Sequence, residues 1–378
     1  MKKIHMVDVV SMYNNHAVII DQKIKKVINS GSYIQGVEVE NFEKKLSYFL
    51  QSKFTISCGN GTDALYIALM ALDLKKGDEV LVPSFTFVST VEAVCLLGLV
   101  PVFIDVDPDT FLLNHNLISK NISAKTKAII PVHLFGQCCD MLAIRNLARK
   151  HKLYIVEDAA QSIGSKCVVN KNKKLKFSGT IGDIGITSFY PSKNLGAFGD
   201  GGAIFTQNKK LANKIKLIAN HGQNKKYNHQ IIGLNSRLDA IQAAVLSFKL
   251  TLLQNHNHKR QKIAKEYNSR LHNLEWIRVP VRKKDSDHVY HQYSIILSNS
   301  IIRKKFQAYL LSNNIPTMIY YPIPLHKQKA YKMYYTNPLP VSERISRQII
   351  SLPIHPEMDI EQIKYICDII KKFRLNES

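Results

Sequence analysis

The chain reads Ser188-Phe-Tyr-Pro-Ser-Lys193-Asn-Leu-Gly-Ala-Phe-Gly-Asp-Gly-Gly202 where an apolar segment, residues 184–189, gives way to a glycine-rich loop. The apolar segment predicts a buried strand, so the lysine of this stretch is expected beside an apolar wall. Burial lowers the pKa of an amine and makes its neutral, nucleophilic form accessible near neutral pH. The stretch therefore predicts that Lys193 is a Schiff-base nucleophile beside a loop that can hold a phosphate.

The composition is that of a globular chain with a large core. Of its 378 residues 45% are hydrophobic, which suits one or two domains. The six cysteines show no C-x-x-C spacing, which favours a reducing compartment. The first ten residues lack the apolar core of a signal peptide, and no run approaches the roughly 18 apolar residues of a membrane span. We therefore expect a cytoplasmic protein without membrane association.

The charge is strongly positive, with 52 Lys and Arg residues against 29 Asp and Glu residues and a formal net charge of +23. Such a charge attracts nucleic acid or a small anionic substrate. The lysines are nevertheless scattered along the chain, and we find no helix-turn-helix or RNA-binding motif. A generally lysine-rich composition is the favoured interpretation, and no nucleic-acid partner is expected.

Short apolar strands alternate with amphipathic helices from residue 54 to about residue 220. This rhythm predicts an α/β fold in which a mostly parallel sheet is covered on both faces. We expect an N-terminal arm and large domain over residues 1–250 and a smaller α/β domain over residues 251–378. The expected strands span residues 54–57, 79–83, 101–105, 128–132, 153–157, 185–189 and 202–206; the expected helices span residues 37–50, 62–72, 88–97, 141–151, 209–219, 236–253, 301–312 and 360–373.

Three further features accompany the lysine. The segment Gly59-Asn-Gly-Thr-Asp-Ala-Leu65 follows a predicted strand and opens a predicted helix, where backbone N–H groups bind phosphate, although an ordinary glycine-rich turn would read the same. Asp158 ends a predicted buried strand, and open α/β sheets bind their ligands at the carboxyl ends of their strands. The alternative roles for this carboxylate are to cap a helix or to bind a metal ion. Phe87 also follows a predicted strand. Its ring either stacks on a planar cofactor or belongs to the hydrophobic core. Together these features favour pyridoxal phosphate (PLP), whose pyridine nitrogen a carboxylate keeps protonated.

On these residues the chain is identified as a member of the DegT/DnrJ/EryC1/StrS family, the PLP-dependent nucleotide-sugar aminotransferases of fold type I. The resemblance covers nearly the full length, and its motifs are jointly specific. They are N-G-T-D-A-L at 60–65, G-D-E-V-L-V-P-S at 77–84, P-V-F-I-D-V at 101–106, P-V-H-L-F-G-Q at 131–137, E-D-A-A-Q at 157–161, the Lys193 segment, and G-L-N-S-R-L-D at 233–239.

The resemblance implies a role for each matching residue. Lys193 would bind the cofactor covalently and later move a proton, and Asp158 would pair with the pyridine nitrogen. Asn235 would reach the phosphate of a neighbouring subunit, so that a homodimer shares its active sites. The other cofactor contacts would be Phe87 on the ring, Gln161 beside the ring oxygen, and Gly61, Thr62 and Ser188 on the phosphate.

The resemblance also bears on the substrate. Tyr190 replaces the histidine of a subgroup that commonly aminates C4, and the loop Tyr320-Tyr-Pro-Ile-Pro-Leu-His326 is similar to that of enzymes acting on dTDP-3-keto-6-deoxyhexoses. Ser192 departs from the glycine usual there. We expect L-glutamate to aminate C3 of such a sugar, giving a dTDP-3-amino-3,6-dideoxyhexose for a surface glycan or a glycoside, with Tyr190 and His326 as substrate contacts.

The alternatives are C4 amination of a UDP- or dTDP-4-keto sugar, and a non-enzymatic regulator on the same fold. Paired histidines suggest no metal site.

Overall fold

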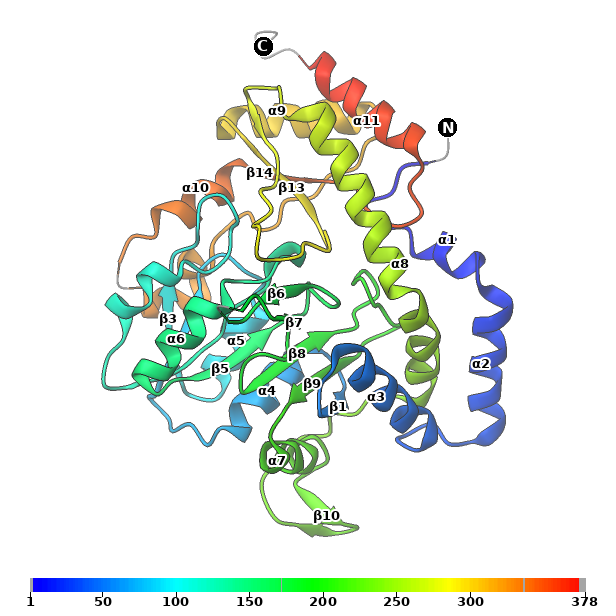
Figure 1. Ribbon diagram of the computed structural model, residues 1–378, viewed down its shortest axis with the longest axis vertical. Helices are drawn as coiled ribbons and strands as arrows, with labels where there is room; N and C mark the ends of the chain where they lie inside the picture. The colour runs from blue at the N-terminus through cyan, green and yellow to red at the C-terminus, as the bar shows by residue number, and fades with distance from the viewer. Residues whose placement is uncertain (1–2, 171, 336, 374–378) are drawn as a thin grey trace.

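The centre of the molecule is a seven-stranded sheet, seen in the computed structural model, which describes residues 3–170, 172–335 and 337–373 (Figure 1). All neighbouring strands are parallel except β9, which lies antiparallel to both of its neighbours. The predicted α/β fold with a mostly parallel mixed sheet is confirmed. The strands, in spatial order, are β1 (Phe54–Cys58), β9 (Gly202–Thr206), β8 (Ile184–Ser188), β5 (Tyr154–Asp158), β4 (Thr126–Ile129), β2 (Glu79–Pro83) and β3 (Val100–Ile104).

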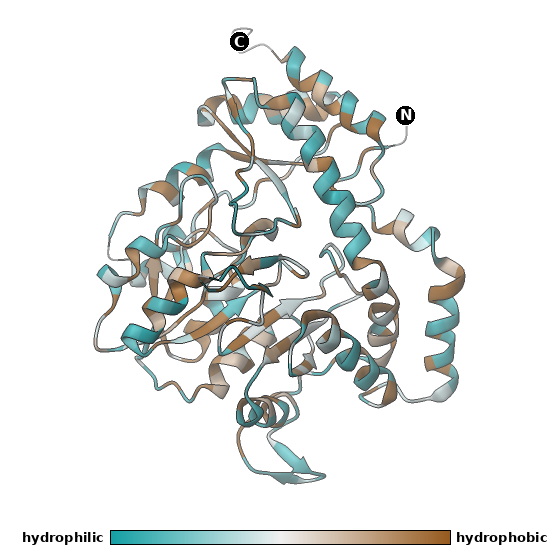
Figure 2. Cartoon of the chain, viewed as in Figure 1, coloured by the Kyte–Doolittle hydropathy of each residue, from teal (hydrophilic) through white to brown (hydrophobic). Residues whose placement is uncertain are grey.

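Both faces of the sheet are buried, which explains why its strands are apolar nearly throughout (Figure 2). Within β2, Val80 and Val82 pack into one core cluster and Leu81 into another, because alternate side chains point to opposite faces. Helices α4 (Gly61–Ala71), α5 (Ser89–Leu96) and α7 (Lys209–Ala219) cover the first face. The second face is covered by α6 (Met141–His151), α3 (Val37–Leu50) and part of α8 (Ala240–Leu271).

Strand β4 ends earlier than the sequence predicts. We expected a strand over residues 128–132, but β4 ends at Ile129. Pro131 follows, and a proline has no N–H for a ladder bond. Its carbonyl still accepts the backbone N–H of Asp158 at 3.0 Å, so the chain continues beside β5 up to the level of that carboxylate.

The C-terminal part forms its own antiparallel sheet of β12 (Ile277–Arg278), β13 (Tyr293–Leu297) and β14 (Ile349–Leu352). Its core also takes in Ile4 from the N-terminal arm. Helix α8 passes through residue 250 without a break and contacts both α3 and α11, so the boundary placed there stays a prediction. The remaining α-helices and strands are α1 (Val9–Asn14), α2 (Ala17–Ser30), β6 (Lys166–Val168), β7 (Leu175–Phe177), β10 (Gln223–Lys225), β11 (Asn228–His229), α9 (Ser300–Ser312), α10 (Pro340–Gln348) and α11 (Ile360–Lys372).

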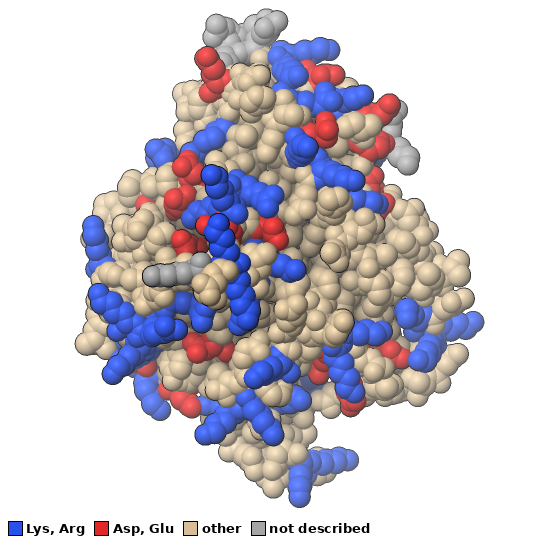
Figure 3. Space-filling model, viewed as in Figure 1, with Lys and Arg blue, Asp and Glu red and all other residues tan. Residues whose placement is uncertain are grey.

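The surface carries Lys and Arg over many elements of the face drawn in Figure 3, interspersed with acidic side chains and uncharged areas. The basic residues do not gather over one helix in that view, in keeping with the scattered lysines of the sequence. The hairpin β10–β11 projects from one end of the molecule (Figure 1). Among the described residues, no helix combines the length and the apolar character that crossing a membrane requires.

Candidate active site

The candidate site lies beyond the carboxyl ends of β5 and β8. Lys193 follows β8 in a tight loop, in which its backbone N–H donates to the Tyr190 carbonyl at 2.8 Å. Gly196 packs so closely on the Pro191 carbonyl that a side chain there would collide with the backbone. The Lys193 side chain is half-buried, and burial lowers the pKa of its amine to about 8, against the opposing charge of Asp158. The neutral form that a nucleophile requires is therefore much more accessible near neutral pH than in an ordinary lysine.

Asp158 ends β5 as a buried carboxylate, only 6% exposed. It accepts hydrogen bonds from the Thr90 hydroxyl at 3.0 Å and from the Ala160 N–H at 3.1 Å. Burial raises the pKa of the Asp158 carboxyl, and these hydrogen bonds and the charge of Lys193 oppose that rise. The pair of Asp158 and Lys193 that the sequence predicts is thus brought together by the two neighbouring strands β5 and β8.

Glu157 points to the other face of β5 and anchors the strand. Its carboxylate is completely buried. One oxygen accepts the N–H groups of Ile181 and Gly182 at 2.5 and 2.6 Å. The other accepts the Gly179 N–H at 3.0 Å and lies 2.9 Å from Nε2 of His133. Four donors therefore fix the residue next to Asp158, a role that the sequence did not indicate.

The start of α4 packs directly on the end of β8. A Cβ at Gly61 would lie 2.8 Å from the Cβ of Ser188, so only glycine allows this approach. Asn60 caps the helix by accepting the Asp63 N–H at 2.8 Å, and the Thr62 hydroxyl lies 2.7 Å from that of Ser89. The first N–H groups of a helix have no partner within it and favour an anion. The predicted phosphate residues Gly61, Thr62 and Ser188 are thus gathered at one helix N-terminus.

Aromatic side chains form a further wall of the site. Phe87 is 53% exposed and its ring centroid lies 6.2 Å from that of Tyr321. The Gln161 amide accepts the Phe135 N–H at 2.8 Å and donates to the Tyr321 hydroxyl at 3.1 Å. Tyr321 therefore links the C-terminal part to the predicted cofactor residues Phe87 and Gln161. The sequence predicted His326 and not Tyr321 as the contact from this loop, because no local pattern distinguishes the two residues.

The remaining predicted residues lie in different environments. Tyr190 is 56% exposed beside Lys193, and Asn235 is exposed. His326 is completely buried: its ring packs between Phe103 and Tyr335, with Nε2 3.2 Å from Glu343. A buried ring held in this way is not presented to a ligand, so the expected substrate contact of His326 gains no support.

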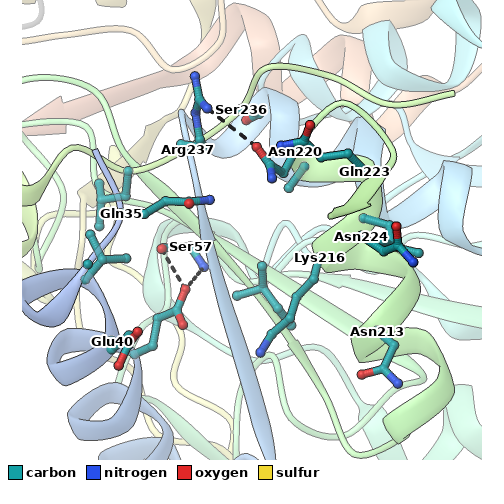
Figure 4. Close-up of a pocket in the computed structure, with 17 residues that line it drawn as sticks. Gln35, Glu40, Ser57, Asn213, Lys216, Asn220, Gln223, Asn224, Ser236 and Arg237 are labelled. Atoms are coloured by element: carbon teal, nitrogen blue, oxygen red, sulfur yellow. Dashed lines mark hydrogen bonds between the residues drawn. The ribbon is translucent and has the colours of Figure 1, made fainter. Parts of the chain in front are cut away.

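The loop that carries Asn235 is tied to the start of α4. The hydroxyl of Ser236 accepts the Gly59 N–H at 2.9 Å and donates to the Asp63 carboxylate at 2.5 Å. The loop also borders a hollow of about 590 Å³ at the β1 edge of the sheet, between α3 and α7. Figure 4 shows Ser57, Lys216 and Arg237 around this hollow. Lys193 and Asp158 are not among its lining residues, so it is separate from the candidate site.

The residues gathered beyond β5 and β8 fit PLP by their chemistry: an amine of lowered pKa, a buried carboxylate, an exposed aromatic ring and a helix N-terminus for a phosphate. Within the described residues, no group of His, Cys, Asp and Glu side chains could hold a metal ion. The fold and this donor set define the class of fold-type I, PLP-dependent aminotransferases.

Comparison with known proteins agrees with this class. Residues 16–371 match the DegT/DnrJ/EryC1/StrS aminotransferase family, and the chain belongs to it. It is 44% identical to a UDP-2-acetamido-2-deoxy-3-oxo-D-glucuronate aminotransferase of Pseudomonas aeruginosa, over 96% of this chain and 99% of that protein. It is 40% identical to a dTDP-3-amino-3,6-dideoxy-alpha-D-galactopyranose transaminase of Aneurinibacillus thermoaerophilus, over 94% and 95% of the two chains.

One similar solved structure contains a cofactor. The chain superposes on NtdA of Bacillus subtilis with bound cofactor PMP with a TM-score of 0.89 and 33% identity, over 98% of this chain and 86% of that one. The predicted family and cofactor are confirmed: the protein is a PLP-dependent nucleotide-sugar aminotransferase. The roles of its individual site residues stay predictions.

Proposed function

We propose that this aminotransferase transfers the amino group of L-glutamate to C3 of a nucleotide-linked 3-keto hexose. The observation that carries this proposal is that two curated relatives, 44% and 40% identical to this chain, are both named for an oxo or amino group at carbon 3. The dTDP-3-keto-6-deoxyhexose expected from the Tyr190 segment is one candidate substrate. The 44% identity to an enzyme named for a UDP-linked 3-oxo-glucuronate favours a second, with a different nucleotide and a carboxylate on the sugar.

The residues of the site would divide the work of this reaction. When bound, PLP accepts the electron pair that is released when a carbon atom beside the amine loses its proton. Asp158 would hold the proton on the pyridine nitrogen, since a buried carboxylate attracts a neighbouring cation strongly. Nζ of Lys193 would hold the cofactor and then carry a proton between carbon atoms. Gly61, Thr62 and Ser188 would bind the phosphate, Phe87 would cover one ring face, and Gln161 would contact the ring oxygen side.

The position of the new amine tests this proposal. The protein is incubated with PLP, ¹⁵N-labelled L-glutamate and one ketosugar at a time: a dTDP-3-keto-6-deoxyhexose, a UDP-2-acetamido-3-oxo-glucuronate or a dTDP-4-keto-6-deoxyhexose. We expect NMR to locate ¹⁵N at C3 of one of the first two products, and the larger kcat/KM identifies the nucleotide and the sugar. Nitrogen at C4 as the preferred product would overturn the proposal in favour of the 4-keto alternative.

We further infer a homodimer in which Asn235 of one subunit completes the active site of the other. Asn235 is exposed close to the projecting hairpin β10–β11. Two apolar side chains of this region are largely exposed, Tyr227 at 81% and Ile232 at 86%. Both lie on the hairpin or on the loop between it and Asn235, where they are available for contact with a second chain. These observations support a contact between the β10–β11 region and a second copy of the chain.

Mixing two inactive variants tests the shared site. Lys193→Ala and Asn235→Ala chains are expected to show little activity alone. Co-expressed, they are expected to recover activity at about a quarter of the sites, since half of the dimers are mixed and each mixed dimer holds one complete site. The measurement is the rate of 2-oxoglutarate formation by the whole co-expressed mixture, relative to the wild-type protein. No recovery in a mixed dimer would show that Asn235 serves its own chain or none.

A further inference from the structure

The residue after the candidate nucleophile is held by a network that the reaction scheme does not use. The side-chain amide of Asn194 donates to the Asn257 carbonyl oxygen at 2.8 Å and to the Val289 backbone carbonyl at 3.1 Å. Its own oxygen lies 3.3 Å from Nδ1 of His291. Three hydrogen bonds therefore connect the loop that carries Lys193 to α8 and to the segment before β13.

This network extends to the other side of the site. Asn257 is 6% exposed and donates to the Ile163 carbonyl at 3.1 Å, two residues after Gln161. Gly164 makes room for this contact, since a Cβ there would lie 2.7 Å from the Asn257 amide nitrogen and its φ of +86° is one that glycine adopts without cost. Asn257 thus joins the turn after Asp158 to the loop of Lys193.

The hydrogen bonds determine the state of His291. Both hydrogens of the Asn194 amide are donated to carbonyl oxygens, so its oxygen is the acceptor and Nδ1 of His291 carries a proton. The imidazole is buried, at 5% exposed. Burial, and then the positive charges of Lys193 and Arg260, hold the pKa of His291 well below its usual range. The ring is therefore neutral, with its single proton directed at Asn194.

We propose that His291 is a positioning residue of the aminotransferase, which acts through Asn194 to hold Lys193 in its desolvated place. Asp158 lies in the neighbouring strand and supplies the opposing negative charge at the Lys193 amine. A neutral imidazole can donate to Asn194 without adding a second positive charge beside that amine. This inference rests on the proposed role of Lys193.

Two substitutions separate positioning from mere packing. His291→Leu removes the donor and retains an apolar side chain, whereas His291→Asn retains an amide N–H at the place of Nδ1. The matched control is His288→Leu: His288 is also buried, with its pKa lowered to about 3, but the causes of that shift are burial and Arg282, and its Nδ1 accepts the Tyr290 N–H. Asn194→Ala removes the same contact from the other side, should His291→Leu not fold.

The primary measurement uses the cofactor-free protein, so it does not depend on the identity of the sugar. Competitive labelling with acetic anhydride across a pH series, followed by mass spectrometry of the Lys193 peptide, gives the pKa of this amine. We expect a value near 8 in the wild-type protein, and in the His288→Leu and His291→Asn proteins. In His291→Leu and Asn194→Ala we expect a rise of about one unit or more, because a looser loop returns the amine to water.

The second measurement is the half-reaction of the PLP-loaded protein with L-glutamate. We expect His291→Leu to lower its maximal rate by about 10-fold or more, with a smaller change in the glutamate concentration at half-saturation, since positioning acts on the reacting step. The effects of His291→Leu and Asn194→Ala should not add in the double variant. An unchanged Lys193 pKa in His291→Leu, or an equal shift in His288→Leu, would overturn the proposal. If the Lys193 pKa changes as expected but no ketosugar is aminated, the proposed substrate is wrong and the role of His291 stands.

Discussion

Lys193→Ala is expected to abolish transamination, lowering kcat by about 10³-fold or more. The structure places this amine next to the charge of Asp158 and lowers its pKa to about 8 by burial. Alanine removes both the group that would hold the cofactor and the group that would carry the proton. The neighbouring Asp158 does not replace either function, because its carboxylate already accepts hydrogen bonds from the Thr90 hydroxyl and the Ala160 N–H.

Lys249 provides a matched control for this prediction. Its amine is also buried, with its pKa lowered to about 8, but burial alone causes this shift and its Nζ lies 5.1 Å from the centre of the Phe198 ring. We expect Lys249→Ala to retain kcat within about threefold, since charge away from the reacting atoms contributes little. The measurement is 2-oxoglutarate formed from L-glutamate, together with the visible absorbance of bound PLP. A Lys193→Ala protein with a near wild-type rate would refute the assignment of the nucleophile.

Glu157→Gln is expected to lower the free energy of unfolding by about 3–5 kcal/mol, the usual cost of breaking a buried charged network. Each carboxylate oxygen of Glu157 faces two donors: three backbone N–H groups and the His133 ring in all. Nε2 of His133 carries the proton, because the Cys139 N–H donates to Nδ1 at 3.1 Å. Whichever way the glutamine amide turns, its NH₂ group meets two N–H donors, which lose their acceptor while buried.

Urea unfolding followed by circular dichroism measures this change, with Glu275→Gln as the control on an exposed glutamate. The control is expected to change the free energy of unfolding by less than about 0.5 kcal/mol. We also expect Glu157→Gln to weaken PLP binding, because Glu157 fixes the strand end that carries Asp158. A loss of stability below about 1 kcal/mol would show that the strand holds its place without this network.

The sequence was sufficient for the strands of the large sheet. Each of the seven was predicted to within three residues at either end, because buried parallel strands are short apolar runs bounded by turn residues. Helix α8 was predicted over residues 236–253 but continues to Leu271. The polar run after Leu253 reads as the end of a buried helix, yet Asn257 and Arg260 are buried there. Their hydrogen bonds to Ile163, Tyr290 and Ile354 come from distant segments, which no local pattern contains.

Lys193, Asp158 and the Gly61 segment were predicted as site residues from the sequence alone, since each lies at or just after the end of a strand whose apolar character is a local property. All three then meet at one edge because the carboxyl ends of parallel strands lie together. Tertiary structure alone decided that Tyr321 reaches Gln161, that His291 binds Asn194, and that His326 is enclosed beside Glu343. These three pairs are separated by 160, 97 and 17 residues, so their environments depend on long-range packing and not on neighbours in the chain.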